Sequence, residues 1–178
     1  TARTEDDVDA ANPRANNRAG HIIELTEDGD DAAATMFTWD IFILCGLPDD
    51  PSTYFAGYPK DSVSPIGAPD NVNFDAAGNL WISTDGQPSA IGFADALHCV
   101  PTAGSQRGNL QQFFSVVAGS ECASFDFTHS YHNLLIAVQH PGEGGTVEEP
   151  LTLWPYTSSV PRPSVVVVVK EDGGMIAQ

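Results

Sequence analysis

The chain has 178 residues, of which 24 are acidic and 7 are basic, and its formal net charge of −17 excludes nucleic acid as a partner because phosphate backbones would be repelled. Apolar residues make up 42% of the chain and charged residues 17%, which is typical of a folded domain and not of a disordered chain. No apolar run approaches the roughly 20 residues that a helix needs to cross a bilayer, so we predict no membrane span.

The first part of the chain is polar up to residue 17, and strand-like apolar runs begin after Gly20. Residues 1–17 are acidic and show neither the period of a strand nor that of a helix, which predicts a lead-in loop that is flexible at its start. Residues 20–44 contain two apolar runs separated by an Asp-Gly pair, which predicts a hairpin. Residues 47–65 contain four prolines and predict a long ordered loop.

The clearest hairpin pattern covers residues 68–86. Val72 and Phe74 alternate with polar residues, a glycine-containing turn reverses the chain, and a second alternating run follows. The alternation does not explain Asp70 and Asn71, two oxygen-rich side chains where the first strand begins. Asp70 and Asn71 are therefore candidates for a functional site at the start of this hairpin.

Residues 127–138 repeat residues 74–84, with Asn133 lying over Asn79 and one extra residue in the loop. A repeat of roughly 40 to 50 residues with four strands is typical of a β-propeller blade, and insertions lengthen it. The offset of 54 between the two asparagines fits such a blade.

The remaining patterned segments are also strands. We predict strands at residues 94–101 and 108–119, and a strand buried on both faces at Val165–Val169, because its β-branched residues are continuous. The fold class is therefore all-β, with antiparallel blades of a β-propeller. About two and a half blades are present, whereas closed propellers have about four to eight, so the ring is predicted to be incomplete.

Three cysteines cannot all be paired within the chain, and their spacing is not that of a zinc site. Cys99 and Cys122 lie in neighbouring strand-like segments, so a disulfide and two buried thiols both remain open. The sequence contains no Gly-x-Ser-x-Gly and no phosphate-cradling Gly-x-x-x-x-Gly-Lys loop, which argues against a serine hydrolase and a nucleotide-binding protein.

Four motifs resemble, in order, the C-terminal part of the PhoX family of secreted bacterial alkaline phosphatases. They are Asn12-Pro13-Arg14 with Gly20-His21, Pro69-Asp70-Asn71 with Leu80-Trp81, Gln139-His140-Pro141-Gly142, and Arg162-Pro163-Ser164. The resemblance implies a periplasmic or extracellular β-propeller that hydrolyses phosphate monoesters with a cluster of calcium and iron ions. It also implies that residues 1–178 are the C-terminal portion of this domain and that the rest of the propeller lies upstream of Thr1.

The family's Arg-Pro-Glu motif and its upstream Cys ligand have no counterpart in this chain, so we expect the segment to be inactive by itself. Two alternatives stay open. One is a non-catalytic binding module that keeps the propeller repeat as a scaffold, and the other is a lactonase-like propeller hydrolase with a single divalent ion. The acidity fits an extracellular setting, where salt screens repulsion, and also fits cation binding.

The resemblance implies metal binding by Asp70, Asn71 and Glu121. Asp70 also matches the metal-binding Asp of regucalcin- and gluconolactonase-type propellers. The second copy of the hairpin has Ala123 in place of Asp70, so the blade itself does not need the carboxylate. The structural alternatives are an Asx motif at the strand start and a solvated glutamate.

The same resemblance implies substrate contacts by Arg14 and His140. The structural alternatives are a surface-loop arginine and a histidine that orders its loop by hydrogen bonds. Asp85, which precedes Gly86 at a strand end, is interpreted as an ordinary turn residue.

Overall fold

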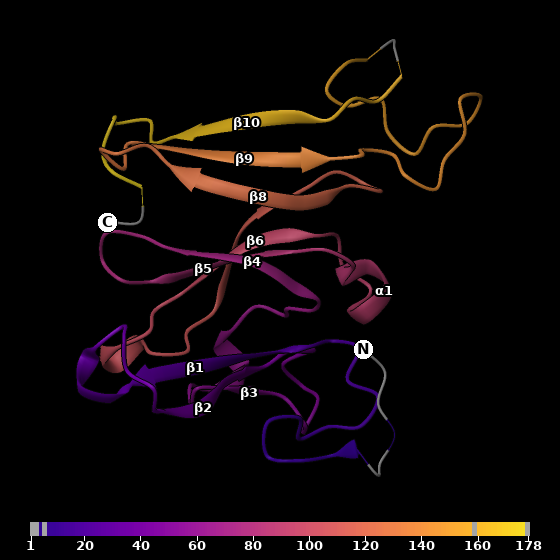
Figure 1. Cartoon of the computed structure of the whole chain (residues 1–178). Helices are drawn as coiled ribbons and strands as arrows, with labels where there is room; N and C mark the ends of the chain where they lie inside the picture. Colours follow the sequence, from indigo (N-terminus) through magenta and orange to yellow (C-terminus); the bar gives the residue numbers. More distant parts are fainter. Residues whose placement is uncertain (1–3, 5–6, 158–159, 177–178) are drawn as a thin grey trace.

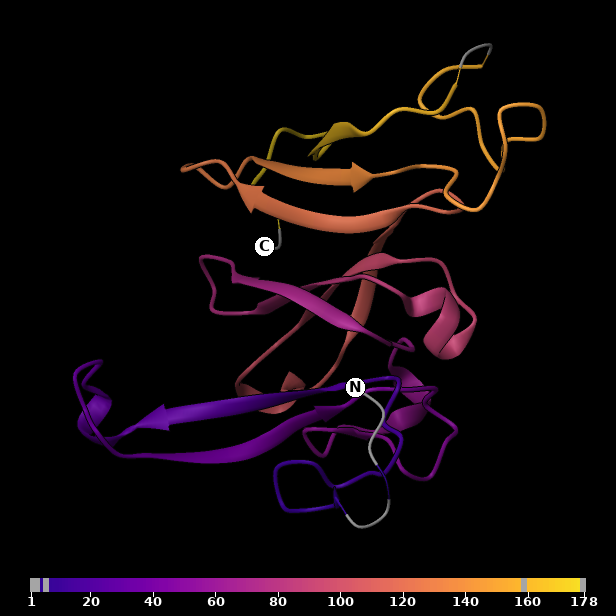
Figure 2. The same cartoon turned by 45° about the vertical axis from the view of Figure 1, so that its right-hand side comes forward.

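The computed structural model describes residues 4, 7–157 and 160–176, and its strands form three separate antiparallel sheets. Figures 1 and 2 show the sheets stacked one above another in chain order. The first sheet contains β1 (His21–Glu27), β2 (Phe37–Leu44) and β3 (Tyr54–Phe55). The second sheet contains β4 (Pro69–Phe74), β5 (Leu80–Thr84), β6 (Ala96–Val100) and β7 (Gln111–Ser115). The third sheet contains β8 (Glu121–Phe127), β9 (Asn133–Gln139) and β10 (Ser164–Val169). One short helix, α1 (Gln87–Ile91), and 3-10 turns at Asp28–Asp30, Lys60–Ser62 and Gly104–Gln106 complete the described elements. The all-β prediction is confirmed, and the number of blades stays a prediction.

The predicted repeat is confirmed at the level of strand register. Phe74 pairs with Leu80 at the end of the β4–β5 hairpin, and Phe127 pairs with Leu134 at the same place in β8–β9. The amide of the residue after each phenylalanine donates to the carbonyl of the asparagine before the paired leucine, at 3.1 Å in the first hairpin and 3.0 Å in the second. Counted between the paired phenylalanine and leucine, the second hairpin has one more residue, 128–133 against 75–79, as the sequence indicates.

Two apolar clusters hold the sheets together. Because side chains alternate along a strand, the middle sheet contributes to both clusters: Leu80 and Ile82 face the first sheet, and Trp81 faces the third. The first cluster also contains Phe42, Ile43 and Phe55, and the second contains Leu97, Leu134 and Ile136. Burying each such side chain contributes about 1.5 to 3 kcal/mol, so these contacts fix the order of the stack.

The prediction for Val165–Val169 is wrong in one respect. The run forms β10, but only Val166 and Val168 pack against the core, while Val165, Val167 and Val169 are 62%, 57% and 59% exposed. β10 is the edge of the last sheet, and in the described part of the chain no further sheet covers its outer face. The run is buried on one face because its neighbours, and not its composition, decide burial.

The other segments largely follow the predictions. Residues 7–17 form neither a strand nor an α-helix, and the flexibility predicted for the start of the lead-in falls partly on residues 1–3, 5 and 6, outside the described residues. The predicted loop at 47–65 contains the two-residue strand β3 and a 3-10 turn. In the described part of the chain, no helix has the length and apolar character to cross a membrane.

All three cysteines are free thiols, so the structure does not form the Cys99–Cys122 disulfide. Burial raises the pKa of Cys45, Cys99 and Cys122 to about 12. A thiol with so high a pKa is not a nucleophile at neutral pH, and the cysteines therefore act as small apolar side chains.

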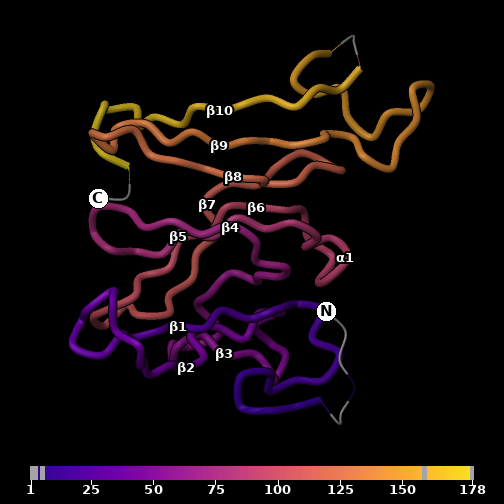
Figure 3. Tube along the Cα trace, in the orientation of Figure 1, coloured from indigo at the N-terminus to yellow at the C-terminus, as the bar shows by residue number. Residues whose placement is uncertain are grey.

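Three connecting segments gather on one side of the stack. Figure 1 shows the N-terminal segment, α1 and the connection between β9 and β10 on its right-hand side. Figure 3 shows the described residues of that connection, 140–157 and 160–163, leading out from the end of β9 and back to the start of β10. This side carries the candidate site.

Candidate functional site

The strands β4 and β8 bring the predicted metal-binding residues to the same side. Asp70 and Asn71 follow the first residue of β4, and Glu121 is the first residue of β8. The starts of the two strands lie next to each other, as a hydrogen bond shows: Nδ2 of Asn71 in β4 donates to the carbonyl oxygen of Ala123 in β8 at 2.7 Å. The repeat thus places equivalent strand starts of neighbouring sheets side by side.

Asn71 also donates through Nδ2 to the carboxylate of Asp70. Both contacts use the amide nitrogen, so the amide oxygen is the atom of Asn71 that a cation could bind. Asp70 and Asn71 are exposed. Carboxylate and amide oxygens are ligands that Ca²⁺ takes in proteins.

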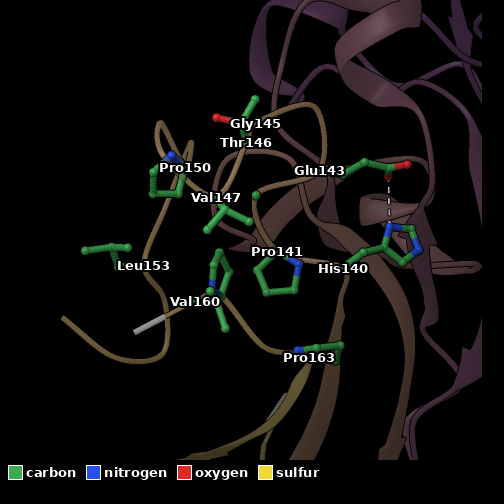
Figure 4. A pocket seen from close by; sticks show the side chains of 12 residues that line it. His140, Pro141, Glu143, Gly145, Thr146, Val147, Pro150, Leu153, Val160 and Pro163 are labelled. Atoms are coloured by element: carbon green, nitrogen blue, oxygen red, sulfur yellow. Dashed lines mark hydrogen bonds and ion pairs between the residues drawn. The ribbon is translucent and has the colours of Figure 1, made fainter. Parts of the chain in front are cut away.

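His140 links two glutamates at the entrance of the third sheet. Its Nε2 lies 3.2 Å from Oε2 of Glu121, and its Nδ1 lies 2.9 Å from Oε2 of Glu143. Figure 4 shows the His140–Glu143 contact, with both side chains turned away from the neighbouring prolines and valines. The contact with Glu121 follows from strand register, because Glu121 pairs with Gln139 and the next residue is His140.

Burial and neighbouring carboxylates raise the pKa of two acidic side chains on this side. Partial burial raises the pKa of Glu121, and the carboxylate of Asp85 adds to the effect, while His140 opposes it. Partial burial also raises the pKa of Asp85, with further contributions from Asp95 and Asp70. Carboxylates that repel one another favour either protonation or a bound cation.

We call the side chains of Asp70, Asp85, Glu121 and Glu143 the acidic rim. Asp85 and Glu143 are the members that the sequence analysis missed. Antiparallel pairing offers a signal for Asp85: Pro69 pairs with Thr84, so the chain returns after β5 to the place where Asp70 lies. For Glu143 the signal is its position three residues after His140, in the turn that follows β9.

A close backbone approach holds the turn of His140 and Glu143 in place. The amide of Glu143 donates to the carbonyl of Gly119 at 3.0 Å, and the amide of Gly142 donates to that of Ala118 at 3.1 Å. Gly119 has a φ of +67°, and a Cβ there would lie 2.5 Å from the carbonyl oxygen of Glu143. A glycine is therefore required at this contact.

Arg14 is anchored and half-buried, and it is not the exposed surface-loop arginine of the alternative interpretation. Its Nη1 donates to the carbonyl of Cys45 at 2.8 Å, and its Nη2 donates to the carbonyl of Gly20 at 2.8 Å and to Oδ1 of Asn17 at 2.7 Å. Desolvation lowers the pKa of Arg14. Its Nε is buried and has no hydrogen-bond partner in the described part of the chain.

The arginine lies in a separate hollow beside the start of β4. This hollow has a volume of about 690 Å³ and is lined by Arg14, Arg18 and His21 on one side and by Ala68 and Pro69 on the other. Gly20 makes the junction close, since a Cβ at this position would lie 2.9 Å from Cδ of Pro69. The hollow that holds these positive side chains thus reaches Pro69, the residue that precedes Asp70 in the chain.

The donors on this side fit a cation in chemical type but do not complete a site. Among the described residues, no three His, Cys, Asp or Glu side chains stand together in the arrangement of a metal centre. Oxygen donors from Asp70, Asn71 and Glu121 suit calcium and iron in chemical type.

Comparison with known proteins gives a consistent assignment. A family model described as "Alkaline phosphatase PhoX" matches residues 1–142. Among solved structures, Pseudomonas fluorescens PhoX in complex with vanadate, a transition state analogue, superposes with a TM-score of 0.78 and 33% sequence identity. The superposition covers 98% of this chain and 30% of the Pseudomonas protein, so the chain spans less than a third of that protein's length. No curated protein matches the chain.

Proposed function

Because the chain belongs to the PhoX family of alkaline phosphatases, we propose that it forms part of a metal-dependent phosphatase that hydrolyses phosphate monoesters and that this segment is inactive alone. The observation that supports the proposal most strongly is the contact between Asn71 and Ala123, which brings the starts of β4 and β8 together. The starts of these two strands carry Asp70, Asn71 and Glu121, and the carboxylate of Asp70 contributes to the raised pKa of Glu121, which supports a shared site.

We assign the roles of the chain's residues as follows. Asp70, Asn71 and Glu121 bind metal through side-chain oxygens, and His140 holds Glu121 in place or contacts the substrate. Calcium and iron ions, when bound, would neutralise the charge of the phosphate and activate the attacking oxygen. Arg14 supplies positive charge near the start of β4, although its terminal nitrogens are already engaged by carbonyl and side-chain oxygens.

The rest of the propeller supplies the missing parts in this proposal. The incomplete ligand set and the 30% coverage of the Pseudomonas protein both support a longer chain as the active unit. A net charge of −17 is tolerated in a salty exterior, which supports a periplasmic or extracellular location.

The experiment that tests the proposal compares two aspartates on neighbouring strands of the full-length protein. Asp70→Ala is expected to lower metal content, measured by mass spectrometry, and to lower phosphate-monoester hydrolysis by about a hundredfold or more, because a charged ligand is removed. The matched control is Asp126→Ala, an exposed aspartate near the other end of β8 that contacts Asn73. This control should keep both metal and activity.

Retention of metal and activity by the Asp70→Ala protein would show that the assignment is wrong. Lactone hydrolysis without phosphatase activity would favour the single-metal alternative, and the absence of both activities would favour the binding module.

A further inference from the structure

The connection between β9 and β10 encloses a second hollow beside His140. It has a volume of about 960 Å³ and is lined mainly by apolar side chains, among them Pro141, Val147, Pro150, Leu153, Val160 and Pro161. We call it the apolar hollow. The match to the family model covers residues 1–142, so almost all of this connection lies outside the matched part of the chain.

The connection is a built structure with its own hydrogen bonds. The amide of Arg162 donates to the carbonyl of Trp154 at 3.3 Å, which ties the two arms of the connection together. Trp154 packs against the apolar cluster between the second and third sheets. These contacts hold the two arms that border the hollow.

The apolar hollow adjoins the acidic rim. His140 and Glu143 line the apolar hollow and also line a smaller hollow of about 250 Å³ that contains Asp85 and Glu121. In Figure 4 the side chains of His140 and Glu143 point away from Val147 and Val160. The two residues thus form the boundary between an acidic and an apolar region.

The lining offers few partners to charged and strongly polar groups. Among the described residues that line it, none is Lys or Arg, and Glu143 is the one acidic residue. An anionic group would find no basic partner in the lining, and a sugar would find few side-chain hydrogen-bond partners. Val147 is 78% exposed and Val160 is 48% exposed, so an apolar ligand would cover surface that now faces water.

We propose that the apolar hollow binds the organic group of the phosphate monoester and selects esters of uncharged, apolar alcohols such as aryl alcohols. This proposal rests on the proposed phosphatase function, with phosphate held on the acidic side of His140. Hydrolysis breaks the bond between phosphorus and the ester oxygen, adds a water oxygen to phosphorus, and leaves the alcohol with a proton. The released alcohol would still fit the hollow, which gives a test that needs no catalysis.

The test uses naphthyl phosphate, its ring-sulfonated counterpart and free naphthol with the full-length protein. We expect kcat/KM to be at least about tenfold higher for the ester whose ring carries no sulfonate, since a buried apolar contact discriminates by this amount or more. We also expect naphthol to bind in calorimetry, with or without metal. Leu153→Asp should reduce the preference and the naphthol affinity, each by about tenfold.

Two further variants make the test independent of folding defects. Val147→Asp changes a side chain at the open edge of the hollow and should act in the same direction as Leu153→Asp. Met36→Asp, in the turn between β1 and β2 where the side chain is 70% exposed, is the matched control and should change neither quantity.

The outcomes separate this inference from the proposed function. Hydrolysis of both esters at equal kcat/KM, or naphthol binding unchanged by Leu153→Asp and Val147→Asp, would overturn the inference and leave the phosphatase assignment intact. Hydrolysis of neither ester would overturn the phosphatase assignment, and naphthol binding would then still decide whether the hollow takes apolar alcohols.

Discussion

His98 in β6 is a titratable side chain that folding keeps uncharged. It is fully buried, and its Nε2 lies 3.1 Å from the carbonyl oxygen of Pro65. Its Nδ1 has no hydrogen-bond partner in the described part of the chain. Burial lowers the pKa of His98 from 6.5 to about 4, because the imidazolium would lose its hydration.

This shift makes stability depend on pH in a predictable direction. Between pH 6.5 and about pH 4 the unfolded chain binds a proton at His98 and the folded chain does not, so the free energy of unfolding falls as pH falls through this range. The loss is at most on the order of 3 kcal/mol. It can be measured by urea unfolding at several pH values.

The control for His98 is His98→Gln, which keeps a donor for Pro65 and does not titrate. Asp85 and Glu121 have raised pKa values and act in the opposite direction, so the difference between the wild type and this variant isolates the histidine. Equal pH dependence in the two proteins would contradict the prediction.

At the scale of elements, the β8 entrance depends on one glycine. Gly119→Ala should move the turn that carries His140 and Glu143, because the new Cβ would overlap the carbonyl oxygen of Glu143. We expect a loss of about 2 kcal/mol in unfolding free energy beyond the cost of a positive φ, together with weaker metal binding in the full-length protein. Thermal unfolding and metal analysis provide the measurements.

Gly78→Ala is the matched control for this prediction. Gly78 has a φ of +80°, but a Cβ there would meet nothing within 4 Å, so this variant reports backbone strain alone. If both alanine variants lose the same stability, the close approach at Gly119 has no energetic role.

The elements also show what the sequence could and could not predict. The β4–β5 and β8–β9 hairpins were predictable because alternation and turn residues act locally, and their register followed from the repeat. The exposed face of β10 was not predictable, since it depends on tertiary packing: in the described part of the chain no sheet packs against this face. The Glu121–His140 contact was not predictable, because a β-bulge between Cys122 and Ser124 shifts the pairing of Glu121 by one residue from the hairpin register. Asp85 could have been found from the hairpin geometry.

At the scale of the whole molecule, the charge of −17 should oppose compaction. Seven basic side chains cannot neutralise 24 acidic ones, even though Arg107 forms a close pair with Glu24 at 2.6 Å. Raising NaCl from about 0.05 M to about 0.5 M should therefore raise the melting temperature by several degrees, because salt screens the net repulsion.

The Arg107–Glu24 pair should lower the melting temperature slightly when NaCl is added, which opposes the larger effect of the net charge. Both side chains are about one-third exposed, so salt weakens the pair only slightly. Arg107→Gln serves as the control and should increase the gain with salt. A melting temperature that falls with added NaCl in the wild type would show that local pairs outweigh the net charge.

The connection of residues 140–163 also has a consequence for the order in which strands assemble and open. Five residues join β8 to β9, whereas this much longer connection separates β9 from β10, and closing it costs about 1 kcal/mol more in chain entropy. With one face in water, β10 should be the first strand of its sheet to detach, and its amides should exchange with deuterium faster than those of β9. Because the apolar hollow lies in the same connection, a bound alcohol would restrain both arms and slow that exchange, so occupancy of the hollow could be followed from the edge of the sheet.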